Sequence, residues 1–286
     1  MSAKPSSPVV LPDVASLRAA VRAWRANGER VALAPTMGAL HAGHASLVRE
    51  GLRRADRVVA SIFVNPTQFA PTEDFSKYPR TFDADLARLG AAGCDACFAP
   101  GVADMYPQGF ATTVTLEGPA KVDLEDHFRP THFAGVATVV AKLLNQAQAD
   151  CAIFGEKDYQ QLKVITRMAR DLDIPTEIVG APTVREDDGL ALSSRNVYLS
   201  ADERARAPAL HGALRMAAAK IAAGEVVGHE MTEAREMLAE AGFVVDYIEA
   251  RHAETLERIA RRADGPIRLL AAARLGQTRL IDNIPV

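Results

Sequence analysis

The strongest constraint on the fold is an alternation of apolar runs with amphipathic segments through the first two thirds of the chain. Residues 31–34 are apolar and end at Pro35, residues 45–54 have helical spacing, and residues 58–64 are apolar again. A strand, a helix and a strand within about 35 residues are typical of a parallel βαβ unit with a right-handed crossover. Further apolar runs lie at residues 96–99, 151–154 and 176–179. These runs predict a Rossmann-like, doubly wound parallel sheet, in which ligands bind beyond the carboxyl ends of the strands.

Amphipathic segments predict the helices that connect these strands. A helix capped by Asp13 should end near Gly28. The residues before Asp13 are interpreted as a proline-rich tail. The other helices of this region are expected at residues 45–54, 83–92, 135–146 and 157–172.

The pattern changes after residue 183, where we place a domain boundary. Residues 201–223 and 229–241 are helical in pattern and rich in Ala, Glu and Arg. Three strands are expected after them, at residues 244–250, 267–272 and 278–281. The prediction is therefore a Rossmann-like nucleotide-binding domain at residues 1–183 and a smaller α+β domain at residues 184–286, which we expect to act as a lid.

The composition is that of an ordinary globular chain, with 48% of its 286 residues hydrophobic and 24% charged. A formal net charge of −3 provides no basic excess for nucleic acid, so any anionic ligand must be bound by local groups. Three cysteines are too few for a disulfide framework and fit a cytoplasmic location. We expect neither a signal sequence nor a membrane segment, because prolines interrupt the first residues and no run approaches the ~18 apolar residues that cross a bilayer.

The segment PTMGALHAGH, residues 35–44, is the most informative motif. It follows a predicted strand and opens a predicted helix, whose free N–H groups and dipole favour a phosphate. Gly38 and Gly43 allow the backbone to approach a ligand, and His41 and His44 would face the same side of the first turn. Two imidazoles there could donate to phosphate oxygens. Taken alone, a chance pair or a helix cap would also explain the two histidines.

A second motif, FGEKDYQQ at residues 154–161, also joins a predicted strand to a predicted helix. Lys157 could place a positive charge on a phosphate, and Asp158 could accept from ribose hydroxyls. The alternative is an ordinary first helical turn, in which acidic residues favour the dipole and the lysine is solvated.

A third motif, DDGLALSSRN at residues 187–196, combines two hydroxyls with a guanidinium. Ser193, Ser194 and Arg195 all carry donors that suit triphosphate oxygens. The alternative is a turn followed by a surface loop.

Two more loops contain polar side chains that could orient a small substrate. Asn65 and Gln68 follow the second strand, and Arg129 and His132 precede a helix. Hydrogen bonding to nearby backbone groups is the alternative role for these side chains.

Taken together, the motifs resemble those of the pantoate–β-alanine ligases, a family within the His-x-x-His nucleotidyltransferases. The resemblance covers nearly the whole chain, in family order. It rests on the segments PTMGALHAGH, SIFVNPTQF, YPRTFDADL, RPTHFAGV, FGEKDYQQL, DGLALSSRN and RLIDN.

The resemblance implies that ATP, (R)-pantoate and β-alanine give pantothenate, AMP and pyrophosphate through a pantoyl adenylate. It also implies Mg²⁺ with ATP, no tightly bound organic cofactor, and a homodimer. Water would hydrolyse the adenylate, so we expect the loop at residues 193–195 to close over it.

The resemblance assigns roles residue by residue. The ATP-binding positions are Met37, Gly38, Ala39, Leu40, His41, Ala42, Gly43, His44, Gly155, Glu156, Lys157, Asp158, Val184, Leu192, Ser193, Ser194 and Arg195. Among these, the catalytic positions are His41, His44, Lys157, Ser193, Ser194 and Arg195. Pantoate would be bound by Gln68, Gln161, Asn65 and His132, and β-alanine by Gln68. The family assigns proton donation to His44, but we expect His44 to act mainly as a hydrogen-bond donor to phosphate oxygens.

Asp85 matches a family position associated with Mg²⁺. Its neighbours Ala84 and Arg88 are not the acidic or amide groups that some members have. We therefore expect most Mg²⁺ bonds to go to phosphates and water.

The motifs are also compatible with two alternatives. One is another adenylyl- or cytidylyltransferase with a different acceptor. The other is a zinc-binding or regulatory protein that uses His41, His44, Cys94 and Cys97, although Cys97 falls in an apolar run where a buried thiol is commoner.

Overall fold

The computed structural model describes residues 7–69, 75 and 78–286. The chain forms two compact units. The first contains Met1–Glu156 and Val164–Pro182, and the second contains Lys157–Lys163 and Thr183–Val286. The larger part of the second unit begins at Thr183, and a short segment from the middle of the chain, Lys157–Lys163, belongs to the same unit.

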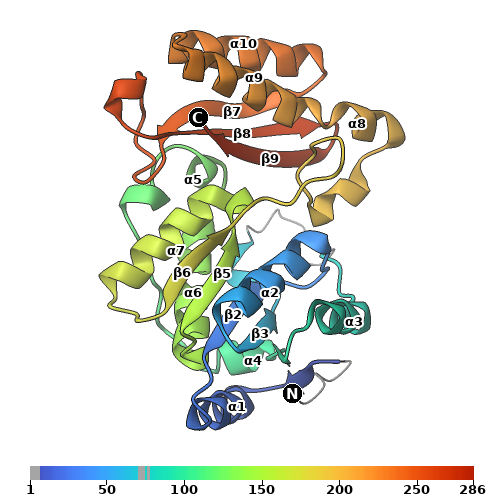
Figure 1. The fold of residues 1–286 in the computed structure, drawn as a ribbon, viewed down its shortest axis with the longest axis vertical. Helices are drawn as coiled ribbons and strands as arrows, with labels where there is room; N and C mark the ends of the chain where they lie inside the picture. The colour runs from blue at the N-terminus through green and yellow to red at the C-terminus, as the bar shows by residue number, and fades with distance from the viewer. Residues whose placement is uncertain (1–6, 70–74, 76–77) are drawn as a thin grey trace. The chain divides into compact units, whose positions relative to one another are not determined.

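A parallel sheet of six strands forms the centre of the first unit (Figure 1), in the order β1-β4-β3-β2-β5-β6. Its strands are β1 (Val9–Leu11), β2 (Val31–Thr36), β3 (Arg57–Ile62), β4 (Ala96–Phe98), β5 (Cys151–Gly155) and β6 (Glu177–Ala181). The predicted fold class is therefore confirmed. The prediction of a plain tail before Asp13 was wrong, because β1 pairs with β4 in parallel from within that proline-rich stretch.

Strand order reverses between β2 and β5. From β2 the chain proceeds outward through β3 and β4, and then it returns to place β5 on the other side of β2. In doubly wound sheets this switch point opens a crevice beyond the carboxyl ends of the strands. The first two motifs follow β2 and β5, the strands that flank this point.

Buried residues on both sides of β2 show that the sheet is covered on both faces. Ala32 and Ala34 belong to a cluster with residues of α2 (Ala42–Arg54) and α3 (Phe82–Ala92). Val31 and Leu33 alternate with them, point to the opposite face and are also fully buried. The helices α1 (Val14–Ala26) and α6 (His132–Ala147) pack against each other and against β2. The remaining helical segments are α4 (Val102–Met105), α5 (Glu125–Phe128), η1 (Pro66–Gln68), η2 (Gly118–Ala120), η3 (Glu156–Asp158) and α7 (Tyr159–Asp171), and α7 passes from the second unit into the first.

The second unit contains an antiparallel sheet in the order β7-β8-β9, with helices packed against it. Its strands are β7 (Val244–His252), β8 (Ile267–Leu275) and β9 (Thr278–Pro285). Its helices are α8 (Ala201–Arg206), α9 (Ala209–Ala223) and α10 (Val227–Glu240), with short turns η4 (Ser194–Tyr198) and η5 (Arg262–Asp264). The single helix predicted at residues 201–223 was wrong. It is divided between α8 and α9 at Pro208, whose ring nitrogen has no hydrogen to donate within a helix.

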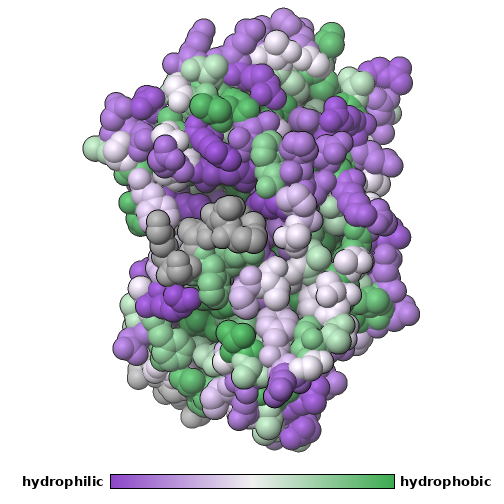
Figure 2. All heavy atoms as spheres, turned by 180° about the vertical axis from the view of Figure 1, so that it is seen from behind, coloured by the Kyte–Doolittle hydropathy of each residue, from purple (hydrophilic) through white to green (hydrophobic). Residues whose placement is uncertain are grey.

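None of the described helices has the length and apolar composition needed to cross a bilayer. On the face drawn in Figure 2, hydrophilic side chains surround smaller apolar areas.

Candidate active site

A strained loop joins β2 to α2 at the switch point. Gly38 and Ala39 follow each other with positive φ angles of 82° and 49°. Glycine adopts such angles at no cost, but alanine is strained there, so the surrounding structure must hold the loop in place. The Thr36 hydroxyl supports the start of the loop by donating to the Ser61 carbonyl at 2.6 Å and accepting the Gly38 N–H at 3.3 Å.

Asp85, on α3, holds the middle of this loop. Its two carboxylate oxygens accept the backbone N–H groups of Ala39 and Leu40 at 3.0 and 2.8 Å. The Thr81 hydroxyl donates to the same carboxylate at 3.2 Å, and Asp85 is only 2% exposed. Both oxygens of the carboxylate are therefore engaged by backbone donors of the loop. The structure gives Asp85 the role of holding the loop.

The two histidines of the first motif form the start of α2. His41 is the N-cap residue, and its Nδ1 accepts the Gly43 N–H at 3.1 Å. The His41 N–H in turn donates to Nδ1 of His44 at 3.2 Å, and the ring centroids are 4.2 Å apart. Because Nδ1 is an acceptor in both rings, the hydrogen-bond pattern assigns the ring proton to Nε2 in each. The two histidines therefore cap the helix through Nδ1, and the same hydrogen bonds make Nε2 of each ring an N–H donor.

Asn65 and Gln68 form a second buried cluster, beyond β3. The Asn65 amide nitrogen donates to Gln68 Oε1 at 3.1 Å and to the Gly135 carbonyl at 3.2 Å. The Gln68 amide nitrogen contacts Met37 Sδ at 2.8 Å. Asn65 therefore orients the Gln68 amide, and the contact with Met37 brings the first motif and the Asn-Pro-Thr-Gln loop together.

His132 and Arg129 support the backbone of Gln68. Nδ1 of His132 lies 3.1 Å from the Gln68 carbonyl oxygen, and Nε2 lies 3.2 Å from Nη1 of Arg129. A second Arg129 nitrogen donates to the same carbonyl at 3.4 Å. Since a carbonyl only accepts, the His132 proton is on Nδ1. The structure thus joins three sequence motifs around Gln68.

Tyr106 is a member of this cluster that the sequence did not indicate. Its hydroxyl donates to Asn65 Oδ1 at 2.8 Å, and the Thr67 hydroxyl donates to the same oxygen at 3.0 Å. Burial raises the pKa of Tyr106, so the phenol remains a donor. The Met-Tyr-Pro context of Tyr106 has no periodic or spacing signal, and only the fold brings it to Asn65.

The remaining motif residues lie in two segments of the chain, residues 155–161 and residues 184–195, and some of them belong to the second unit. Gly155 ends β5, Glu156 and Asp158 are the ends of η3, and Gln161 is a half-buried residue of α7. The Lys157 ammonium lies 4.0 Å from the Asp158 carboxylate. Farther along, the Val184 carbonyl accepts the Leu192 N–H at 3.0 Å, and the Ser193 hydroxyl accepts the Arg195 N–H at 3.2 Å. Ser194 is half-buried and Arg195 is exposed, which suits side chains that meet a ligand from solvent.

Comparison with known proteins decides the family. The family model described as pantoate-beta-alanine ligase matches residues 9–285. The chain belongs to the pantoate-beta-alanine ligase family.

Relatives and solved structures agree with this membership over nearly the full length. A pantothenate synthetase 2 from Bradyrhizobium diazoefficiens is 58% identical over 98% of this chain and 99% of that protein. The crystal structure of pantothenate synthetase from Thermus thermophilus has a TM-score of 0.91 and 48% identity, covering 96% of this chain and 98% of the other. A pantoate-beta-alanine ligase from Francisella tularensis, complexed with beta-gamma ATP and beta-alanine, has a TM-score of 0.81 and 31% identity over 98% of each chain. The predicted family, fold and ligase activity are confirmed.

The zinc alternative finds no support among the described residues. Cys94 and Cys97 are buried, and they do not form a metal-binding group with His41 and His44 in that part of the chain. Burial raises the pKa of the Cys97 thiol to about 12, which disfavours the thiolate that zinc requires.

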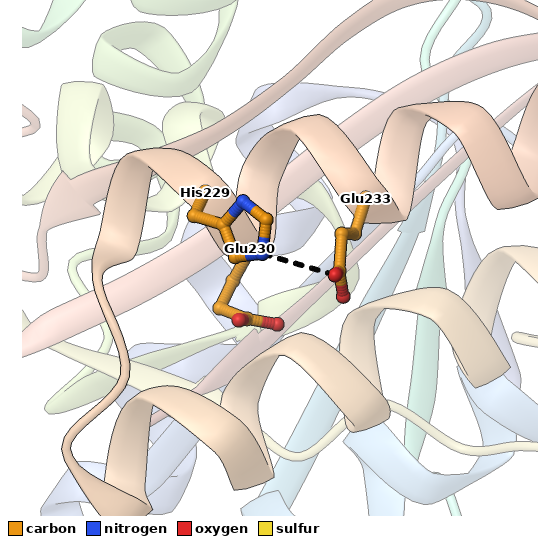
Figure 3. Close-up of side chains that lie close together, drawn as sticks. All are labelled: His229, Glu230 and Glu233. Atoms are coloured by element: carbon orange, nitrogen blue, oxygen red, sulfur yellow. Dashed lines mark ion pairs between the residues drawn. The ribbon is translucent and has the colours of Figure 1, made fainter.

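Another cluster of possible metal ligands lies on α10 of the second unit, where His229, Glu230 and Glu233 approach one another (Figure 3). His229 Nε2 is 3.0 Å from Glu233. The Lys220 ammonium forms ion pairs with both carboxylates, at 3.3 Å from Glu230. A cation from the chain itself therefore compensates the acidic groups, and we interpret the cluster as an ion-pair network between α9 and α10.

Proposed function

We propose that this protein condenses (R)-pantoate with β-alanine at the expense of ATP, releasing pantothenate, AMP and pyrophosphate. The observation that carries the proposal is the family match over residues 9–285. The Francisella tularensis structure, described as holding ATP and β-alanine ligands, supports the choice of two of the substrates.

The chemistry requires activation of pantoate before the amide bond can form. A pantoate carboxylate oxygen attacks the α-phosphorus of ATP, and the bond from that phosphorus to the pyrophosphate oxygen breaks. The neutral amine of β-alanine then attacks the carbonyl carbon of the adenylate. The bond from this carbon to the phosphate oxygen breaks, AMP leaves with the electron pair, and the amine loses a proton.

His41 and His44 would stabilise the first of these steps. Negative charge moves from the α-phosphate toward pyrophosphate, and Nε2–H donors at the start of α2 meet such charge without adding a proton. The free N–H groups and the dipole of this helix turn act in the same direction. The fixed loop at Gly38 and Ala39 would keep the backbone close enough to the phosphates.

We further propose that the remaining motif residues take the roles that the resemblance implies. Lys157, Ser193, Ser194 and Arg195 would donate to the triphosphate. Contacts with the rest of the nucleotide would come from the positions Gly155, Glu156, Asp158, Val184 and Leu192. The lid role of residues 184–286 stays a prediction.

Pantoate and β-alanine would be bound through Gln68, with Gln161 as a second amide for pantoate. The hydrogen bonds of Asn65 and His132 to Gln68 support a positioning role for these two residues. A buried amide held in one orientation discriminates strongly between donor and acceptor groups of a substrate.

Mg²⁺ would accompany ATP, with phosphate oxygens and water as its ligands. The engagement of Asp85 by the loop N–H groups supports this assignment. We propose no tightly bound organic cofactor, a homodimer and a cytoplasmic location, the last supported by three free, buried cysteines.

The decisive experiment measures products while each substrate is omitted in turn. AMP and pantothenate should form only when ATP, pantoate and β-alanine are all present. Pantoate alone should trigger pyrophosphate release in a single turnover with ATP. Release with another acid but not with pantoate would favour a different nucleotidyltransferase of the superfamily.

A further inference from the structure

Asp282 and Asn283 are adjacent polar residues on β9, and both are 3% exposed. Successive side chains of a strand point to opposite faces of its sheet, so the Asp282 and Asn283 side chains lie on opposite faces. Ala271, the cross-strand neighbour of Asp282, belongs to the core cluster that this sheet forms with α9 and α10. Asn283 faces away from that cluster, opposite Leu270.

Asp282 holds the hairpin that contains the first half of the third motif. Arg185 forms a bidentate pair with the Asp282 carboxylate, with distances of 2.7 and 2.8 Å. The same guanidinium donates to the Gly189 carbonyl at 3.0 Å. Backbone hydrogen bonds close the hairpin from Glu186 to Leu190 and from Leu192 to Val184. Ser193 follows immediately, so the position of its loop depends on the Asp282–Arg185 pair.

The Asp282 carboxylate is ionised in this setting. Burial raises the pKa of Asp282, but the neighbouring His211 and Arg185 side chains more than offset it, and the pKa lies below its ordinary value. A protonated carboxyl would lose half of the bidentate arrangement.

Asn283 holds the backbone of the second motif. Its amide nitrogen donates to the Lys157 carbonyl at 2.9 Å, and its amide oxygen accepts from Nε of Arg268 at 2.7 Å. The Arg268 guanidinium lies 4.2 Å from the centre of the Tyr159 ring, and the Tyr159 hydroxyl donates to the Ala253 carbonyl at 2.9 Å. Asn283 therefore fixes the main chain of Lys157 through this hydrogen bond.

Stability alone does not account for this pair. A buried ion pair costs so much desolvation that an apolar pair of similar volume is often as stable or more stable. The flanking residues Ile281 and Ile284 are apolar, so β9 could accommodate such residues on both faces. Polar side chains at these two positions form hydrogen bonds that apolar side chains could not form. These hydrogen bonds fix the positions of two loops.

We propose that Asp282 and Asn283 are positioning residues for ATP, which together set the spacing between Lys157 and the Ser193–Arg195 loop. The inference rests on the proposed function, because it takes both segments to bind the triphosphate. Asp282 acts through its pair with Arg185 and Asn283 through its bond to the Lys157 carbonyl, so both act through the donors that they hold in place.

The first test compares Asp282→Asn with Asp246→Asn. Asp246 is a matched control in the same sheet, because its carboxylate is only 8% exposed and accepts from Nε of Arg279 at 2.6 Å. Both variants should lower the melting temperature. Asp282→Asn should also raise KM for ATP at least tenfold and leave KM for β-alanine within twofold, whereas Asp246→Asn should leave both constants within twofold. Arg185→Lys, which keeps the charge but not the bidentate geometry, replaces Asp282→Asn if that variant does not fold.

The second test uses Asn283→Asp. A carboxylate can still accept from Arg268, but it cannot donate to the Lys157 carbonyl. Titration calorimetry of ATP, with pantoate absent, should show at least tenfold weaker binding than in the parent protein.

Two results would overturn the positioning role. One is ATP binding and KM within twofold of the parent in folded Asp282→Asn and Asn283→Asp proteins. The other is an equal loss in Asp246→Asn, which would mean that any weakening of this sheet has the same effect. The parent protein is assayed first for pantothenate formation. If the parent protein does not form pantothenate, the proposed function is wrong. The ATP-binding measurements would still test the positioning role in that case.

Discussion

The backbone N–H of His41 donates to Nδ1 of His44 over 3.2 Å, so one histidine fixes the ring of the other. This bond satisfies one of the N–H groups that a helix start leaves without an intrahelical partner. It also assigns the ring proton of His44 to Nε2, the atom that we propose as a donor to phosphate. The helix cap and the proposed phosphate donor depend on the same ring in wild-type His44, and comparison of two substitutions distinguishes them.

His44→Ala removes both functions. We expect adenylate formation to slow about a hundredfold or more, because a lost donor of this kind costs ~3 kcal/mol of transition-state stabilisation. His44→Asn keeps an acceptor near the Nδ1 position, so its melting temperature should stay closer to the parent while adenylation remains slow. Rapid-quench measurement of pyrophosphate release in a single turnover checks both variants. Near-parental rates in either would remove His44 from the phosphate site.

Asp85→Asn tests whether this residue holds the loop or binds Mg²⁺. The amide cannot accept both the Ala39 and Leu40 N–H groups, so a buried donor loses its partner at a cost of about 1–3 kcal/mol. We expect a lower free energy of unfolding, a higher KM for ATP and a half-saturating Mg²⁺ concentration within twofold of the parent. Chemical denaturation and Mg²⁺ titration of turnover measure these quantities. A large rise in the Mg²⁺ requirement with unchanged stability would instead make Asp85 a metal ligand.

Gly135→Ala tests the contact between α6 and the loop that contains Gln68. A Cβ atom at Gly135 would lie 2.4 Å from the Thr67 carbonyl oxygen, which is too close for any real contact. We expect a loss of stability of about 1–3 kcal/mol, as for other overpacked sites, and a several-fold higher KM for pantoate as Gln68 is displaced.

Gly212→Ala is the matched control for that substitution. Gly212 is also within a helix, α9, but an added Cβ there meets nothing within 4 Å. Alanine should be neutral or raise the free energy of unfolding by about 0.5–1 kcal/mol, with an unchanged KM for pantoate. A similar loss of stability in Gly212→Ala would contradict the prediction, because the Thr67 contact could not then explain the Gly135 result.

The buried Cys97 thiol should make the free energy of unfolding depend on pH in the alkaline range. Burial raises the pKa of this thiol to about 12 from an ordinary value of 9.0. The unfolded chain therefore loses the thiol proton at a lower pH than the folded chain. The contribution of the buried, protonated thiol to the free energy of unfolding is complete below pH 9 and falls as pH rises toward 12. The parent should lose on the order of 1 kcal/mol per pH unit above pH 9 relative to Cys97→Ala. Parallel denaturation curves at pH 8 and pH 10 measure the difference, and an equal response of both proteins would contradict the prediction.

Local sequence patterns predicted much of the fold because they report local preferences. Five of the six parallel strands follow from apolar runs, and the sheet of the second unit follows from three more. β1 was missed because three residues in a proline-rich stretch have too short a pattern, and only pairing with β4 makes them a strand. The continuous helix at residues 201–223 was wrong because an apolar pattern can continue through Pro208 although the hydrogen bonding cannot.

By itself, the sequence determined the order of strands and helices, the family and the motifs after β2 and β5, because each depends on residues close together in the chain. Tertiary structure decided which distant residues hold those motifs in place. Asp85 reaches Leu40 across 45 positions, and Asn283 reaches Lys157 across 126. Such contacts depend on strand order and on which face each side chain takes, and neither leaves a periodic signal in the sequence. For the same reason the polar residues of β9, which the sequence offered only as part of a family motif, acquire a physical role once the sheet is formed.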